Sequence, residues 1–142
     1  MKKKVAISAC LMGQHCRYDG RHNLQQQIID RYGAENLLPL CPEVLGGLPT
    51  PRVPAEMQGN KICTQSGTDV TAAFMAGADE ALKQAEAAGV QAAILKAKSP
   101  SCGCGLIYDG SFSGRLVPGD GIFTQKLKAK GIKVTTELDY II

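Results

Sequence analysis

Short apolar runs alternate with helical segments along the chain, and this alternation restricts the possible fold more than any other feature of the sequence. Four runs have the length and composition of β-strands. They are residues 4–9, 37–40, 91–95 and 132–136. The clearest helical stripe lies between the second and third runs, at Val70, Phe74, Ala78, Leu82 and Ala85. Alternating strands and helices predict an α/β fold, here a single three-layer Rossmann-like domain over residues 1–142 with a largely parallel sheet.

Capping residues set the expected limits of three helices. Asn23 is a plausible cap for a first helix that stops at Gly33, and Thr68 or Asp69 opens a second that closes at Gly89. Phe123 and Leu127 mark a third helix, which ends at Gly131. Residues 106–117 read as a hairpin or excursion. We expect Phe74 and Met75 to pack in the core instead of contacting a ligand.

The segment from residue 44 to residue 69 lacks a convincing periodicity. Five of the seven prolines fall between positions 39 and 54, which makes the chain there stiff and extended. Long connections without secondary structure are uncommon in a compact domain unless they are functional. The sequence therefore predicts a long Pro/Gly-rich lid loop, with residues 61–64 as an edge strand.

Composition excludes several classes of function. The chain has 142 residues, of which 44% are hydrophobic, but no apolar tract is long enough for a membrane span. A net charge of +3 is too small to indicate nucleic-acid binding. Three lysines at positions 2–4 precede an apolar stretch, but Ser8, Cys10 and the lack of a small-x-small site argue against a signal peptide. We expect a cytoplasmic protein that binds neither nucleic acid nor membrane, and the sequence leaves its oligomeric state open.

Six cysteines in a reducing compartment indicate metal binding, catalysis or inert burial instead of disulfides. Cys10, Cys41 and Cys102 each follow a predicted strand, so a parallel sheet would bring them to one edge. Three thiolates without an obvious fourth ligand leave an open coordination position, as a catalytic metal requires. Thiolates favour zinc or an iron–sulfur cluster, and ligation by cysteine does not distinguish the two.

The remaining cysteines carry weaker signals. Cys104 forms a C-x-C pair with Cys102, in which one thiol could be a ligand and the other idle. We expect Cys16 and Cys63 to be structural, because free cysteine often behaves as a small buried hydrophobe. His15 and His22 could supplement the ligand set, although loop histidines are more often ordinary surface residues.

Polar residues near the predicted strand ends are candidates for catalysis or binding. Glu43 could move protons beside a metal, or could be a surface carboxylate or helix cap. Ser99 and Ser101 could hydrogen-bond a polar ligand or cap the local turn. Only one of Lys96 and Lys98 can face the site, because they alternate across the strand end. Arg52 places a cation on the predicted lid. It could have a structural role, or it could bind an anionic or carbonyl-bearing ligand.

Six ordered motifs make the chain resemble a known family. They are Ser-Ala-Cys-Leu at 8–11, Cys-Arg-Tyr-Asp-Gly at 16–20, Cys-Pro-Glu at 41–43, Gly-Gly-Leu-Pro-Thr-Pro-Arg at 46–52, Ser-Pro-Ser-Cys-Gly at 99–103 and Ile-Tyr-Asp-Gly at 107–110. The sequence is similar over nearly its whole length to a bacterial family long catalogued as a domain of unknown function, one branch of which is thiouracil desulfurase.

The resemblance implies a cofactor, an activity and a set of site residues. It implies a [4Fe–4S] cluster held by Cys10, Cys41 and Cys102, with one iron free to take the sulfur of a thionated base. Glu43 and either Ser99 or Ser101 match the family's catalytic positions, and Cys104 lies outside the shared motif. The implied reaction is a hydrolytic, non-redox desulfuration of thiouracil or a related thionated small molecule.

Two other interpretations come from different functional classes. A non-catalytic zinc-binding or redox-sensing module would use four cysteines, with Cys104 or Cys16 as the fourth ligand, and would leave no position for substrate. A thiol enzyme without a metal would use Cys102 as its nucleophile, near the lysines. Coordination and the number of essential cysteines separate these interpretations from the desulfurase.

Overall fold

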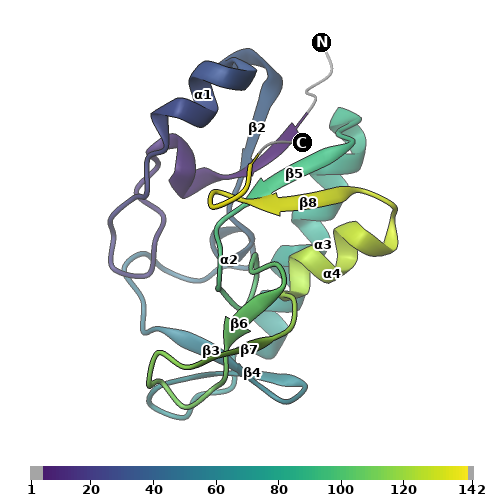
Figure 1. The fold of residues 1–142 in the computed structure, drawn as a ribbon. Coiled ribbons are helices and arrows are strands. Elements are labelled where there is room, and N and C mark those ends of the chain that lie inside the picture. The colour runs from purple at the N-terminus through teal and green to yellow at the C-terminus, as the bar shows by residue number, and fades with distance from the viewer. Residues whose placement is uncertain (1–4, 141–142) are drawn as a thin grey trace.

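The centre of the computed structural model, which describes residues 5–140, is a four-stranded sheet whose strands all run parallel. The strands lie in the order β2 (Leu37–Leu40), β1 (Val5–Ser8), β5 (Ala92–Leu95) and β8 (Lys133–Thr136) (Figure 1). In the register, Val5 lies opposite Leu37 on one side and Ala92 on the other. All residues of β1 and β5 are buried, as expected for central strands of a sheet covered on both faces.

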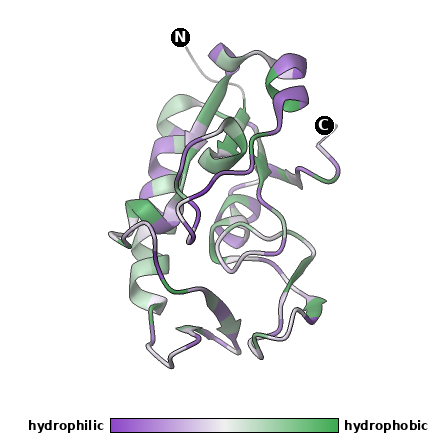
Figure 2. Cartoon of the chain, turned by 90° about the vertical axis from the view of Figure 1, so that its left-hand side faces the viewer, coloured by the Kyte–Doolittle hydropathy of each residue, from purple (hydrophilic) through white to green (hydrophobic). Residues whose placement is uncertain are grey.

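Helices cover both faces of the sheet, which confirms the prediction of a three-layer α/β fold with a parallel sheet. On one face lie α3 (Thr71–Ala88) and α4 (Ile122–Ala129), which share a core with Ala6, Ala93 and Leu95. On the other face lie α1 (Gln26–Tyr32) and the 3₁₀ helix η1 (Ala9–Met12), packed on Val5, Ile7 and Ile94. Figure 2 shows the resulting pattern, with hydrophobic colour on the sheet strands and both colours on the covering helices. Alternate strand residues therefore supply two separate cores.

Two antiparallel hairpins lie at one end of the sheet, below it in Figure 1. The first pairs β3 (Ala55–Gln58) with β4 (Lys61–Thr64), and the second pairs β6 (Leu106–Tyr108) with β7 (Leu116–Pro118). The second hairpin and the strand at 61–64 confirm the sequence predictions. The prediction of a structureless lid over 44–69 was wrong for its second half, because β3 was missed.

The helix ends are only partly as predicted. Gly33 and Gly89 end α1 and α3, and Gly89 adopts the left-handed conformation typical of a helix C-terminus, with φ 75°. The first helix begins later than Asn23, because Gln25 occupies the capping position. Helix α3 begins at Thr71, whose backbone N–H donates to the Asp69 carboxylate at 2.9 Å. The predicted strand at 4–9 is shorter, since η1 follows Ser8 directly, and residue 4 lies outside the described residues.

The short helix α2 (Pro42–Leu45) packs against α3 with backbone against backbone. A Cβ atom added to Gly77 would lie 1.7 Å from the Pro42 carbonyl oxygen, and one added to Gly46 would lie 2.0 Å from the Ala73 carbonyl oxygen. Only glycine fits at both positions. This contact fixes the segment that follows β2. A further 3₁₀ helix, η2 (Ala34–Asn36), precedes β2. Between residues 5 and 140, we find no helix that is long and apolar enough to cross a membrane.

Candidate active site

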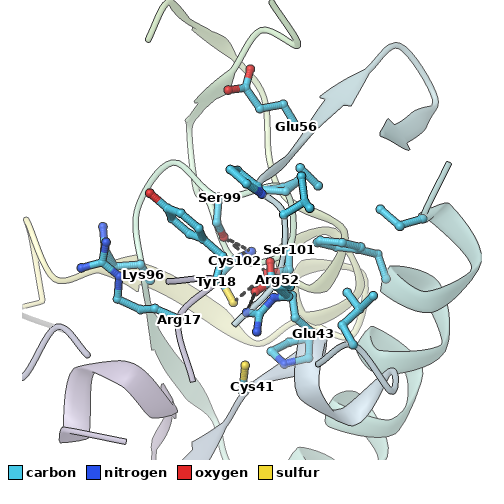
Figure 3. Close-up of a pocket in the computed structure, with 18 of the residues that line it drawn as sticks. Arg17, Tyr18, Cys41, Glu43, Arg52, Glu56, Lys96, Ser99, Ser101 and Cys102 are labelled. Atoms are coloured by element: carbon cyan, nitrogen blue, oxygen red, sulfur yellow. Dashed lines mark hydrogen bonds and ion pairs between the residues drawn. The ribbon is translucent and has the colours of Figure 1, made fainter. Parts of the chain in front are cut away.

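A cavity of about 910 Å³ lies at the carboxyl ends of β1, β2 and β5 (Figure 3). Its walls continue over the loop before β3 and over both hairpins. Four of the six cysteines line it: Cys10, Cys16, Cys41 and Cys102. The structure therefore brings together the three cysteines predicted at the strand ends, and adds a fourth.

Cys10 is placed by the turn that follows β1. It lies on η1, which ends at Gly13 with φ 91°, and its carbonyl oxygen accepts backbone N–H groups from Gly13 and Asn23. The Asn23 side-chain amide donates to Cys10 Sγ at 3.6 Å. The pKa of Cys10 is lowered, mainly by a hydrogen bond from the Cys16 thiol and less by Asn23 and Lys96, while burial acts in the opposite direction. Asn23 is thus a site residue, although the sequence predicted it to be a helix cap.

Cys41 lies between the end of β2 and the first turn of α2. Pro42 occupies the first helical position, where its fixed φ favours the helix and its missing N–H costs nothing. The pKa of Cys41 is lowered to about 7 by hydrogen bonds from the Cys16 thiol and from the Val44 backbone N–H at the start of α2. Burial and the Glu43 carboxylate partly offset this effect.

Cys102 is held in a tight turn that follows β5. Its backbone N–H donates to Ser99 Oγ at 2.8 Å, and the Ser101 hydroxyl donates to Cys102 Sγ at 3.6 Å. The first turn of α4 closes over this segment, with the Thr124 hydroxyl donating to the Cys102 carbonyl oxygen at 2.9 Å. Burial raises the pKa of the Cys102 thiol to about 12. A metal site would therefore have to displace a proton from this sulfur.

Cys16 lies against the thiols of Cys10 and Cys41, although the sequence predicted a structural role for it. Its pKa is raised far above that of a free cysteine, chiefly by its side-chain interactions with these two thiols and less by burial. Cys41 Sγ also lies 3.9 Å from the Cys16 carbonyl oxygen. In the described part of the chain, no three His, Cys, Asp or Glu side chains are grouped closely enough to hold a single metal ion.

Glu43 projects from the first turn of α2 and forms an ion pair with Arg52. The Arg52 side chain is only 7% exposed, and its guanidinium also donates to the Cys16 carbonyl oxygen at 2.9 Å. The Arg52 backbone N–H donates to the Tyr18 carbonyl oxygen at 2.6 Å. Arg52 therefore ties the first half of the predicted lid to the Cys16 loop and to the Glu43 carboxylate. Figure 3 shows Arg52 beside Glu43.

Both candidate serines line the cavity, with their hydroxyl oxygens 3.4 Å apart. Ser101 is buried, whereas Ser99 is half-buried. Of the two candidate lysines, Lys96 lines the cavity and Lys98 does not. Lys96 Nζ lies 2.9 Å from Glu137 Oε2.

Comparison with known proteins agrees with this arrangement. The family model of 2-thiouracil desulfurase matches residues 5–139, which is almost the entire chain. The chain belongs to the 2-thiouracil desulfurase family. A solved structure described as the [4Fe-4S]-dependent thiouracil desulfidase TudS is similar, with a TM-score of 0.92 and 49% sequence identity over 98% of this chain and 93% of that one. The uncharacterized protein YbbK of Bacillus subtilis (strain 168) is 41% identical over 143 residues, covering 94% of this chain and 95% of YbbK.

Some candidate residues of this desulfurase-family chain lie outside the cavity. Cys63, Cys104, His15 and His22 do not line it. Cys104 Sγ instead lies 3.7 Å from the Val134 carbonyl oxygen on β8, and the two histidine rings contact each other edge to face. Phe74, predicted to pack only in the core, is buried and also forms part of the cavity wall.

Several cavity residues were not among the candidates predicted from the sequence. Tyr18, Glu56, Tyr108 and Phe112 line the cavity, and the last three come from the two hairpins. Tyr18 and Tyr108 lie inside motifs of the family resemblance, so those motifs were the available clue. Glu56 lies on the strand that the sequence did not reveal.

Proposed function

We propose that this protein is a [4Fe–4S]-dependent desulfurase that acts on 2-thiouracil or a related thionated small molecule. The observation that carries the proposal is the convergence of Cys10, Cys41 and Cys102 with Glu43 on one cavity. Membership of the family and the similarity to TudS support the same reaction, and favour it over a zinc module. The overall change is hydrolytic: the oxygen of water replaces the sulfur of the thiocarbonyl, and the sulfur leaves as hydrogen sulfide with no net transfer of electrons.

The residues around the cavity fit a cluster of this kind. Thiolates are the ligands that iron–sulfur clusters take, and hydrogen bonds to ligand sulfurs tune such sites. Asn23 and Ser101 supply such hydrogen bonds to Cys10 and Cys102. We assign Cys10, Cys41 and Cys102 as the ligands, and Cys16 as a neighbour that supports Cys10 and Cys41. When bound, the cluster would supply a Lewis-acidic iron without a protein ligand, which polarises the thiocarbonyl.

Glu43 is the group we assign to move the proton of the attacking water. Its side chain is 19% exposed and lies in the cavity wall, so its carboxylate can reach a water molecule there. The ion pair with Arg52 holds the carboxylate in place without using the second carboxylate oxygen. A positioned carboxylate of this type accelerates proton transfer in many hydrolytic reactions.

Ser99 is the serine that is better placed to orient the substrate. The Ser101 hydroxyl is directed at Cys102 Sγ, so it supports the ligand. Ser99 Oγ accepts the Cys102 backbone N–H and is less buried than Ser101. Its hydroxyl proton can be donated to Ser101 Oγ, 3.4 Å away, and would turn to a ring heteroatom of the base when substrate binds.

Iron and acid-labile sulfide content, measured on protein prepared without oxygen, test the proposal first. We expect about four irons per chain, and release of sulfide from 2-thiouracil with formation of uracil. Alanine at Cys10, Cys41 or Cys102 should each abolish iron binding, whereas Cys16→Ala should retain iron and Cys63→Ala should retain both iron and activity.

Two results would count against this assignment. Stoichiometric zinc with no uptake of iron would favour the zinc module instead. If Cys16→Ala lost its iron while Cys41→Ala kept its full iron content, Cys16 would be a ligand in place of Cys41. The cytoplasmic location and the absence of nucleic-acid and membrane partners stay predictions.

A further inference from the structure

Glu56 is a buried carboxylate that the desulfurase reaction does not use. It lies on β3, is 9% exposed and lines the cavity. Figure 3 shows it at the end of the cavity away from Cys41. Burying a carboxylate is unfavourable unless hydrogen bonds compensate for the lost water. The partners of Glu56 therefore indicate what it does.

Among the described residues, both hydrogen bonds accepted by the Glu56 carboxylate come from the backbone of the loop between β6 and β7. Glu56 Oε1 accepts the Gly110 N–H at 3.0 Å and the Phe112 N–H at 3.2 Å. Gln58, on the same strand, donates from its side-chain amide to the Gly110 carbonyl oxygen at 2.8 Å. A Cβ atom added to Gly110 would lie 2.8 Å from the Met57 carbonyl oxygen, so the loop lies directly on β3.

The loop residue held by Glu56 has an unusual backbone conformation. Phe112 has a φ of 57°, which is disfavoured for a residue with a large side chain. Such conformations persist where surrounding contacts over-determine them, and they are concentrated at functional sites. Phe112 lines the cavity, together with Tyr108 from the same hairpin.

An aromatic side chain at this position suits the ligand of the proposed function. Planar heterocycles pack on aromatic rings whatever their pattern of hydrogen-bonding groups. The hairpin end of the cavity supplies the rings of Phe112 and Tyr108, and the loop that carries Cys16 supplies the ring of Tyr18 beside the thiols.

We infer that Glu56 is a positioning residue, which holds the loop over residues 109–114 so that Phe112 forms the wall on which the ring of the substrate packs. The identity of that ring rests on the proposed function, but the hold of Glu56 on the loop does not. Glu56 acts through Phe112 and takes no part in moving protons or binding the cluster.

The absence of tryptophan from the sequence allows a direct test of the loop. Phe112→Trp introduces a single tryptophan, whose emission and quenching by acrylamide report its exposure in the cluster-loaded protein. In this background, Glu56→Ala should shift the emission to longer wavelength and increase quenching. Glu56→Gln, which keeps an acceptor oxygen, should restore most of the parent signal. Glu86→Ala removes an exposed carboxylate on α3 and should change nothing.

Steady-state kinetics on variants without the added tryptophan test whether the substrate ring packs on Phe112. Loss of an aromatic stacking surface weakens binding of a base by roughly 5- to 150-fold. We therefore expect Glu56→Ala and Phe112→Leu to raise KM for 2-thiouracil by about tenfold or more, with kcat and iron content near those of the parent. The Glu56→Gln variant should recover most of the loss in KM.

Each result separates the inference from the proposed function. Unchanged fluorescence in Glu56→Ala would overturn the positioning role, even if every variant desulfurises thiouracil. If Glu56→Ala alters the fluorescence but leaves KM unchanged in an active enzyme, Phe112 does not form the wall on which the substrate ring packs. If the parent protein binds iron but does not act on thiouracil, the proposed function fails, and the fluorescence result still decides whether Glu56 holds the loop.

Discussion

The two ends of the cavity are built in different ways. At the thiol end, Cys10, Cys41 and Cys102 follow three strands of one parallel sheet, so the topology of the sheet brings them together. At the hairpin end, Glu56 and Phe112 come from two separate hairpins that are joined by side-chain hydrogen bonds to the backbone. The first end depends on the core of the protein and the second on a few local contacts. Changes at the thiol end should therefore remove the chemistry, and changes at the hairpin end should alter binding.

The largest effect is expected from Glu43→Gln at the thiol end. The amide is nearly the same size and can still accept a hydrogen bond from Arg52, but it cannot take a proton from water. Since positioned acid–base groups contribute roughly 10²- to 10⁴-fold to rate, we expect kcat to fall by that factor. KM and iron content should stay near those of the parent, as measured by steady-state assays and metal analysis. A parent-like kcat would remove Glu43 from the mechanism, and Glu86→Gln on α3 is the matched control.

A methyl group added at Gly77 should have the next largest effect. The new Cβ would lie 1.7 Å from the Pro42 carbonyl oxygen, so α2 must move away from α3. Overpacking of this kind costs about 1–3 kcal/mol of stability. Because Cys41 and Glu43 move with α2, Gly77→Ala should lower both the Tm and the iron retained by the protein. Ala87→Ser adds one atom to the exposed face of the same helix and should change neither.

The corresponding change at the hairpin end is Gly110→Ala, and it sharpens the comparison. Gly110 has a φ of 95° and packs on Met57 and Gln58, so a side chain there should displace the loop. We expect this variant to raise KM while it retains its iron. If Gly110→Ala lost iron as Gly77→Ala should, the two ends of the cavity would not be independent.

The same difference explains how much of the site could be predicted from the sequence. Apolar runs and their order predict a parallel sheet, and a parallel sheet determines where Cys10, Cys41 and Cys102 meet. The contact between Glu56 and Phe112 joins residues 56 positions apart, and no local pattern marks either partner. Strand β3 was missed because Ala-Glu-Met-Gln contains no β-branched or aromatic residue. Its pairing with β4 stabilises it instead.

Asn23 and Cys16 show a second limit of sequence reasoning. Asn23 has the side chain of a helix cap and precedes a helical stripe, so local rules favoured that role. In the structure its amide donates to Cys10 Sγ, and Gln25 precedes the helix. Cys16 lies in the loop between η1 and α1, where no regular element positions it. Its approach to Cys10 and Cys41 therefore depends on tertiary contacts, among them the hydrogen bond from Arg52 to the Cys16 carbonyl oxygen.

The smallest effect is expected from Cys104→Ser, and it tests whether the sheet or the C-x-C pair determines the ligands. Cys104 is two residues from Cys102, but its thiol lies against the Val134 carbonyl oxygen on β8 and outside the cavity. Serine can replace the thiol there and donate the same hydrogen bond, so iron content, sulfide release and Tm should match the parent. Cys102→Ser should lose the iron. A loss of iron in Cys104→Ser would mean that the turn after β5 rearranges when the cluster binds, and that the sheet alone does not fix the thiol end of the cavity.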